Sequence, residues 1–296
     1  MAGSELLQFV VTGITVGSVY GLVALGFTII YNATGVINFA QGEFVVLGGL
    51  CFYTLYEAAH LPLLLALLGA VLIVAVVGLL MERLAIRPLL GAPVVTLIMV
   101  TIGVSVILRG LAKLIWGSES LSVHPFSGNK SLFLGGAALQ LQYLWVLGLT
   151  ALAVLAVRLF FDHTLVGKAM QACAINPEAA RLAGISVERM VQASFALSAG
   201  LSALAGAVIS PVTFATYDAG IVLGLKGFCG AIVGGLGNGL GAVVGGLAVG
   251  VLQSLGVGLA PQGYTGFEDA FAFIILLLVL FLRPSGLLGR RRAEGV

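Results

Sequence analysis

Charged residues are scarce in this chain: Asp, Glu, Lys and Arg make up 9% of its 296 residues, whereas 60% are hydrophobic. Soluble domains carry about 25% charged residues, so the composition excludes an ordinary water-soluble domain. It suits a protein whose surface faces acyl chains. The net charge is only +2 and no basic stripe occurs, which argues against a nucleic-acid-binding protein.

Cysteine and histidine are few and scattered, with three of each. The cysteines Cys51, Cys173 and Cys229 lie far apart and form no CxxC pair. The sequence therefore supports neither a disulfide framework nor a metal site.

Catalytic and nucleotide-binding motifs are also missing. The chain contains no HExxH, no G-x-S-x-G and no GxxxxGK[ST]. Residues 237–242 formally fit G-x-G-x-x-G/A, but no strand pattern precedes them. We therefore expect no catalytic group and no cofactor on this chain, so that any ATP is handled by another polypeptide.

Long apolar segments dominate what is present. A helix needs about 20 residues to cross the hydrocarbon core, and open strands cannot cross it. Proline and glycine mark the ends of these segments, as at Pro62, Pro211 and Arg283-Pro284. Nine segments are long enough to be considered: 6–31, 36–56, 61–82, 93–116, 141–161, 190–211, 219–236, 240–259 and 267–283. We predict one all-α polytopic membrane domain over 1–296, with about eight or nine transmembrane or broken helices.

Segments 36–56 and 219–236 contain polar residues and many glycines, so either could be short, broken or re-entrant. The first segment lacks the basic start of a signal peptide and is expected to remain in the membrane.

Basic residues are distributed unequally between the two faces that nine crossings create. One face has only Arg109, Lys113 and Lys130. The opposite face has Arg83, Arg87, Arg158, Lys168, Arg181, Arg189, Arg283, Arg290, Arg291 and Arg292. Because lysine and arginine accumulate on the cytoplasmic side, we predict an outer N-terminus and a cytosolic C-terminus. Residues 162–189 then lie in the cytosol and the loop 117–140 lies outside.

Small residues recur every four positions within several segments. The repeats are Gly13/Gly17/Gly21, Ser194/Ser198/Ser202/Gly206/Ser210, Gly230/Gly234, Gly241/Gly245 and Gly246/Gly250. Such stripes let helix backbones approach closely, and they indicate ordinary helix packing. The alternative is a smooth face along which helices slide.

Four polar residues fall inside predicted membrane segments: Asn38, Gln41, Glu43 and Lys226. An ionisable residue at mid-helix costs about 2.5–3.5 kcal/mol on insertion scales, so it should face a partner or a wet cavity. Gly-interrupted segments in opposite halves of a chain are typical of a central translocation site. These residues either line a path or hold the structure together, with Glu43 and Lys226 paired to helix ends or to each other.

The stretch 168–189 is a polar island between two apolar segments. Asn176 suits a helix cap and Pro177 the first helical position, and Gly184 suits the end. We predict a short helix that docks a cytosolic partner, the alternative being a plain interfacial helix. The residues assigned to docking are Asn176, Pro177, Glu178, Ala179, Ala180, Arg181 and Gly184.

Residues 178–184, EAARLAG, resemble the EAA-x3-G coupling loop of ABC-importer permeases. Three further motifs follow in the order of one family: GSVYGLVALGFTIIYNATGVINFAQGEF at 17–44, KGFCGAIVGGLGNGLGAVVGG at 226–246, and FLRPSGLLG at 281–289. Over nearly its whole length the chain is similar to permease subunits of branched-chain amino-acid ABC importers, a family that includes urea and amide permeases.

The resemblance implies an ABC-importer permease fold in a bacterial inner membrane. It implies a second homologous permease subunit, two cytosolic ATPase subunits that bind ATP and Mg, and a periplasmic solute-binding protein. The loop 117–140, with Asp218, Glu268 and Asp269, is the surface available to the binding protein, unless these acidic residues simply solvate loop ends.

The leading hypothesis is thus a permease subunit that forms the path for branched-chain or hydrophobic amino acids. An ABC permease for urea, amides or small carboxylates is an alternative. A stand-alone ion-coupled secondary transporter, using Glu43 and Lys226, is another. An intramembrane enzyme ranks last.

Overall fold

The structure, a computed structural model, describes residues 3–128, 130–134, 137–259, 268–283 and 285–289. Six helices in this part are long and apolar enough to cross a membrane. They are α1 (Gly3–Thr34), α3 (Leu63–Met81, continuing through short turns to Leu89), α4 (Val94–Trp116), α5 (Leu141–His163), α8 (Val187–Thr213) and α10 (Gly239–Leu259). The prediction of an all-α polytopic membrane protein is confirmed.

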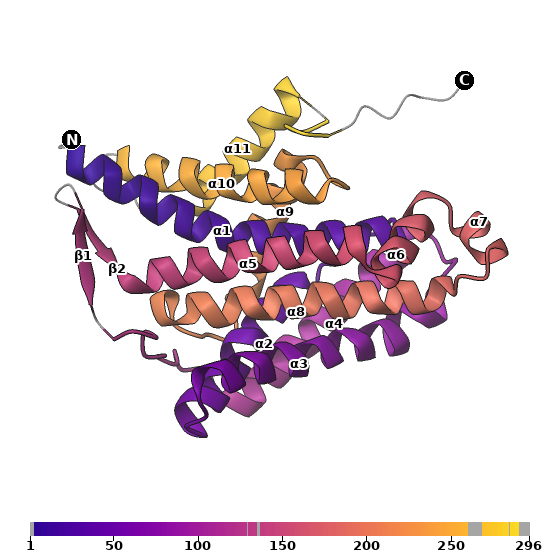
Figure 1. The fold of residues 1–296 in the computed structure, drawn as a ribbon, viewed down its shortest axis with the longest axis horizontal. Coiled ribbons are helices and arrows are strands. Elements are labelled where there is room, and N and C mark those ends of the chain that lie inside the picture. The colour runs from indigo at the N-terminus through magenta and orange to yellow at the C-terminus, as the bar shows by residue number, and fades with distance from the viewer. Residues whose placement is uncertain (1–2, 129, 135–136, 260–267, 284, 290–296) are drawn as a thin grey trace.

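Five shorter helices complete the bundle (Figure 1): α2 (Gln41–Tyr53), α6 (Leu165–Ile175), α7 (Pro177–Leu182), α9 (Gly220–Gly234) and α11 (Glu268–Leu282). Residues 36–56 contain α2, of 13 residues, which continues without a break into the π-helical turn Thr54–Ala58, and residues 219–236 contain α9, of 15 residues. At 1.5 Å per residue α9 is about 23 Å long, less than the roughly 30 Å hydrocarbon core. Each follows a non-helical stretch, 35–40 or 214–219, so both segments are broken helices.

The two broken helices meet at their N-termini. A methyl group at Gly42 of α2 would overlap the carbonyl oxygen of Gly220, and one at Gly220 would touch the Glu43 carboxylate. Only glycine allows this approach of two backbones. The two helix starts are therefore held together inside the bundle.

Glycines also set the distance between α1 and α10, which lie side by side in Figure 1. A methyl group at Gly250 would overlap the backbone of Gly17, and one at Gly246 would overlap that of Gly21. The serine stripe of α8 is likewise buried, with Ser198 near Gly26 of α1 and Gly206 against the Val45 carbonyl of α2. The small-residue repeats therefore serve helix packing in this structure, as the packing interpretation predicted.

Pro211 does not end its helix, contrary to the sequence prediction, because α8 continues to Thr213. Proline cannot donate to the carbonyl four residues earlier, that of Ala207. The hydroxyl of Ser210 donates to this carbonyl instead, at 3.0 Å, which satisfies it and lets the last turn persist.

The loop 117–140 contains a β-hairpin that the sequence reading missed. Strand β1 (Ser131–Leu134) pairs antiparallel with β2 (Ala137–Gln140), with Ser131 opposite Gln140. Residue 129 and the turn 135–136 lie outside the described residues. The same loop reaches the break before α9, since Leu121 and Ala215 exchange two backbone hydrogen bonds of 3.0 and 2.9 Å.

Figure 1 places the start of α1 and the hairpin at one end of the bundle and α6 and α7 at the other. The loop 117–140 and the segment 162–189, which α5 connects, are therefore at opposite ends of the bundle. Asp218 is exposed in the linker before α9. The side chains of Glu268 and Asp269, and the residues Arg290, Arg291 and Arg292, lie outside what the structure describes.

The contact between α1 and α10 predicts a difference between two Gly→Ala variants. Gly250→Ala should lower stability by about 1–3 kcal/mol, because its methyl group overpacks the α1 backbone. Gly148→Ala on α5 is the matched control, since nothing lies within 4 Å of its added carbon, and it should be neutral or stabilising. Thermal unfolding of the purified protein measures both; equal midpoints would contradict the account.

Candidate functional site

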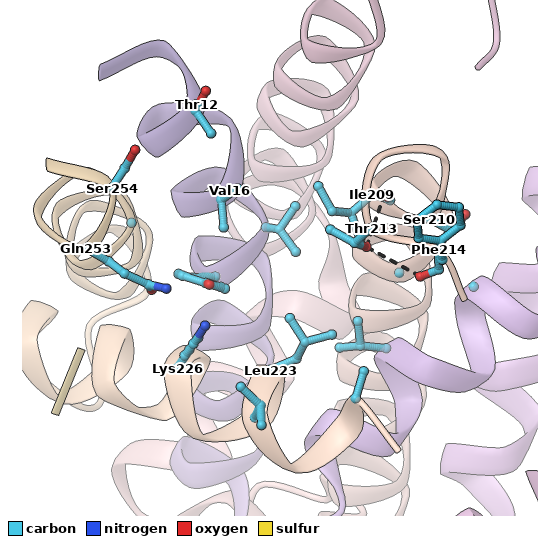
Figure 2. Close-up of a pocket in the computed structure, with 18 of the residues that line it drawn as sticks. Thr12, Val16, Ile209, Ser210, Thr213, Phe214, Leu223, Lys226, Gln253 and Ser254 are labelled. Atoms are coloured by element: carbon cyan, nitrogen blue, oxygen red, sulfur yellow. Dashed lines mark hydrogen bonds between the residues drawn. The ribbon is translucent and has the colours of Figure 1, made fainter. Parts of the chain in front are cut away.

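A cavity of about 690 Å³ opens between α1, α2, α8, α9 and α10 (Figure 2). Its walls are largely apolar, with Val16, Val46, Ile209 and Leu223 among the lining residues. Polar side chains are interspersed and come from several helices and from the linker before α9: Glu5, Gln8, Thr12, Tyr20, Ser210, Thr213, Thr216, Lys226, Gln253 and Ser254. Cavities of this size and character are typical of small-molecule sites.

Lys226 lies where this cavity ends. Tyr20, Lys226 and Gly250 line it, whereas one turn further along the same helices are in close contact. A methyl group at Gly227 would overlap Val23, and one at Gly230 would meet Gly246. The Lys226 ammonium lies 5.7 Å from the centre of the Tyr20 ring, a cation–π arrangement. Lys226 is thus at the closed inner end of the cavity.

A second cavity, of about 910 Å³, lies beyond this closure toward the α6 end. It is lined by α1 from Leu25 onward, by α5 and α6, and by the turn between α9 and α10. On α1, only the turn 21–24 separates the residues of the first cavity from those of the second. In the part of the chain that the structure describes, a cavity thus lies toward each end of α1, and the turn 21–24 lies between the two.

The other three predicted path residues are buried at the start of α2 and, among the described residues, do not line the first cavity. Asn38 accepts a hydrogen bond from the Ala40 amide at 3.0 Å, which shapes the turn into α2. Gln41 donates to the hydroxyls of Ser198 and Ser202 at 2.8 and 2.7 Å. Gln41 thereby fixes α2 to the serine stripe of α8.

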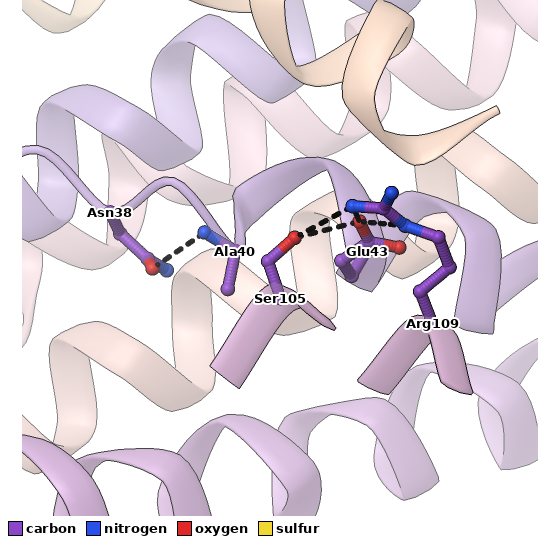
Figure 3. A network of polar contacts seen from close by, with 5 residues as sticks. All are labelled: Asn38, Ala40, Glu43, Ser105 and Arg109. Carbon is purple, nitrogen blue, oxygen red and sulfur yellow. Dashed lines mark hydrogen bonds and ion pairs between the residues drawn. The ribbon is translucent and has the colours of Figure 1, made fainter. Parts of the chain in front are cut away.

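Glu43 forms an ion pair with Arg109 of α4, with 3.1 Å between Oε1 and the guanidinium (Figure 3). Ser105 donates to the same carboxylate oxygen at 2.9 Å. The second oxygen, Oε2, is buried without a hydrogen-bond partner and lies close to Gly220, at the start of α9. The partial positive charge of a helix N-terminus favours a carboxylate at this place.

Sequence reasoning assigned Arg109 to the outer face and did not foresee this pair. Arg109 lies two turns inside α4, and only 26% of its side chain is exposed. The available signal was the spacing of Ser105 and Arg109, which puts two polar residues on one face of an otherwise apolar helix. Other buried polar residues were missed as well, among them Glu82, Gln142 and Gln253. Gln142 ties the outer loop to α8 by bonding to Phe126 and Val208.

The island at the opposite end folds as predicted. Asn176 caps α7 by accepting from the Ala179 amide at 3.0 Å, and Pro177 takes the first helical position. Gly184 ends it with φ of +82°, and the Ile185 amide bonds back to the Ala180 carbonyl at 3.0 Å. Ala180 is buried, which anchors α7 to the body.

The solvent-facing side of this island is exposed and partly apolar. Leu182 is 91% exposed and Ile175 is 86% exposed, beside the exposed Glu178, Ala179 and Arg181. Arg181 also lies 3.4 Å from Glu188 at the start of α8. We call Ile175–Gly184, the segment predicted from sequence to dock a partner, the docking surface. Large exposed apolar side chains with a charged rim are characteristic of protein contacts.

The residues that the structure describes include no cluster of three or more His, Cys, Asp or Glu suited to a metal ion. Their three cysteines are buried and unpaired.

Known proteins resemble this chain over nearly its full length. The family model described as branched-chain amino acid transport system / permease component matches residues 9–280. The high-affinity branched-chain amino acid transport system permease protein LivH of Salmonella typhimurium is 31% identical, over 98% of this chain and 97% of LivH. The corresponding protein BraD of Pseudomonas aeruginosa is 31% identical, over 98% of each.

A solved structure shares the fold. PsaBC from Streptococcus pneumoniae, in complex with Fab, aligns with a TM-score of 0.52 over 96% of this chain and 94% of that chain. The identity is 15%, so this likeness concerns the fold alone.

The ion pair at α2 predicts a non-additive mutant cycle. Arg109→Met should cost about 3–5 kcal/mol, because it leaves the Glu43 carboxylate buried and unpaired. Adding Glu43→Gln should recover part of this loss, since no buried charge remains. Arg158→Met is the control: its pair with Asp162 is exposed and 3.6 Å long, so it should cost at most about 1 kcal/mol. Thermal unfolding measures the set, and strict additivity of the two changes would contradict the account.

Proposed function

Because the chain belongs to the family of branched-chain amino acid transport permease components, we propose that it is the membrane subunit of an ATP-driven importer of branched-chain and other hydrophobic amino acids. The family match over residues 9–280 is the observation that carries this proposal. Membership of this family implies transport rather than catalysis. The finer proposal is that the chain does no chemistry itself, and that partner ATPase subunits bind ATP and Mg.

The proposed partners follow from the two ends of the bundle. Two cytosolic ATPase subunits bind the docking surfaces of this chain and of a second, homologous permease. A periplasmic solute-binding protein docks at the hairpin end. The N-terminus is outside and the C-terminus is in the cytosol of a bacterial inner membrane, which agrees with the basic residues around α6 and α7.

Coupling starts at the docking surface, where burial of Leu182 and Ile175 on the ATPase would supply apolar contact area. The mechanical connection from the docking surface into the membrane runs along α8, which begins three residues after Gly184. Through Ser198 and Ser202, α8 holds Gln41 of α2, and its far end leads into α9. A displacement of α8 would therefore move both broken helices, on which Glu43 and Lys226 lie.

The solute path includes the two cavities and the closed layer between them. Lys226 lines it directly, while Asn38, Gln41 and Glu43 shape it by fixing the start of α2. Apolar walls suit a hydrophobic amino acid better than urea or an amide, because urea offers no apolar surface to bury.

Reconstitution tests the function. Proteoliposomes that contain this chain with its homologous permease, two ATPases and a loaded binding protein should accumulate leucine, isoleucine or valine when ATP is supplied. Vesicles with this chain alone should accumulate none. Uptake by the chain alone, driven by an ion gradient, would instead establish the secondary-transporter alternative.

The docking surface predicts a charge substitution that uncouples assembly. Leu182→Asp should abolish co-purification of the ATPase and lower ATP-driven uptake at least tenfold, because a carboxylate would be buried in the contact. The fold should persist, since Leu182 is 91% exposed. Leu61→Asp, an exposed leucine at the opposite end, is the control and should retain the ATPase. Normal ATPase binding by Leu182→Asp would contradict the assignment.

A further inference from the structure

A small groove of about 180 Å³ lies between α4 and α9, beside the break before α2. Its polar lining side chains are Ser105 and Arg109, which also hold Glu43. The other residues that line it are Phe27, Phe39, Ile102, Val106, Ile221, Gly224, Leu225 and Phe228. We call these ten residues the α4–α9 groove. Several of them are exposed on the surface of the chain: Phe39, Ile102, Val106 and Ile221.

The groove lies at membrane depth. The span α4 has 23 residues, so it is about 34 Å long. The Phe39 amide donates to the Thr101 hydroxyl at 3.2 Å, which places the break before α2 about 10 Å from the start of α4. Arg109 lies about 10 Å from the other end of the same helix. Both features are therefore inside a hydrocarbon core of roughly 30 Å.

Acyl chains are a poor cover for this face. Non-helical backbone does not occur where lipid reaches it, yet Phe39 lies in such a turn and is 36% exposed. The Arg109 side chain is 26% exposed, and a charged group that faces lipid is costly.

The guanidinium of Arg109 also lacks an acceptor. Its Nε and Nη2 donate to Glu43. Its third nitrogen, Nη1, has no hydrogen-bond partner among the residues that the structure describes, and Figure 3 shows it pointing away from Glu43. An acyl chain offers no acceptor to this nitrogen, whereas a protein surface can.

We propose that the α4–α9 groove is the contact face for the second, homologous permease subunit, which covers the break with an apolar helix and supplies a hydrogen-bond acceptor to Arg109 Nη1. The proposal rests on the proposed function and deepens it, because it names the face on which that subunit binds. Of the partners proposed above, only the second permease lies in the membrane, so only it reaches this depth.

This contact would place the second subunit against both broken helices. Ile221 is in the first turn of α9, and Phe39 lies two residues before α2. The Glu43 carboxylate lies between the two helix starts, close to Gly220. A movement of one permease against the other would therefore act directly on α2 and α9.

The first test is photo-crosslinking in membranes that contain the complete importer. Val106, which is 61% exposed, is replaced by p-benzoylphenylalanine. Illumination should join this variant covalently to the homologous permease, as mass spectrometry of the adduct would show. Leu111 is the matched control: it is 48% exposed on the same helix, but it lies about 140° around the helix from Val106 and does not line the groove. The Leu111 variant should give adducts with lipid only.

The second test is assembly. Val106→Trp should lower the amount of homologous permease that co-purifies with this chain about tenfold, because the larger ring overpacks the contact. The chain itself should be produced at the wild-type level, since Val106 is exposed. Leu111→Trp should retain the second subunit. If Val106→Trp is not produced, Ile221→Trp, on the opposite wall of the groove, decides in its place.

Adducts with lipid alone from the Val106 position, or wild-type co-purification by both tryptophan variants, would overturn the inference and leave the proposed function standing. A complex that gives the Val106 adduct but accumulates no amino acid under ATP would overturn the proposed function and leave the contact between the permeases standing.

Discussion

Close contact between glycine backbones is the constraint on which this structure depends. In lipid, the hydrophobic effect contributes little to the association of helices. The stability of a helix bundle must therefore come from van der Waals packing and hydrogen bonds. Gly17 and Gly21 against Gly250 and Gly246 bring α1 and α10 together, and Gly42 against Gly220 joins the two broken helices. Gly21 and Gly246 lie in the closed layer between the two cavities, which is therefore formed in part by close backbone contact.

Polar side chains divide into two groups. One group fixes the broken helices: Gln41 through α8, and Glu43 through Arg109 and Ser105 of α4. The other lies at the first cavity, which both Lys226 and Gln253 line. Buried charges survive in a membrane protein when they are paired or face a polar space, and the chain uses both solutions.

Much of this could be read from sequence because it follows from local rules. Apolar length gave the helices, and Asn176, Pro177 and Gly184 gave the limits of α7. Long-range pairing could not be read, because one sequence does not say which faces of distant helices meet. The Glu43–Arg109 pair spans 66 positions, and the contact of α2 with α9 spans far more. The hairpin was missed because hydropathy patterns carry little information outside lipid, and Pro211 because a serine hydroxyl replaced the missing donor.

The proposed function depends most directly on one claim: the end of the bundle that bears α7 faces the cytosol, where the ATPase subunits would bind. Native cysteines are buried, so single cysteines at Glu178 and at Glu119, an exposed residue of the outer loop, can be labelled with a membrane-impermeant maleimide. The account predicts that Glu178→Cys reacts only in inside-out vesicles and Glu119→Cys only in intact spheroplasts. Labelling of Glu178→Cys from outside intact spheroplasts would contradict it.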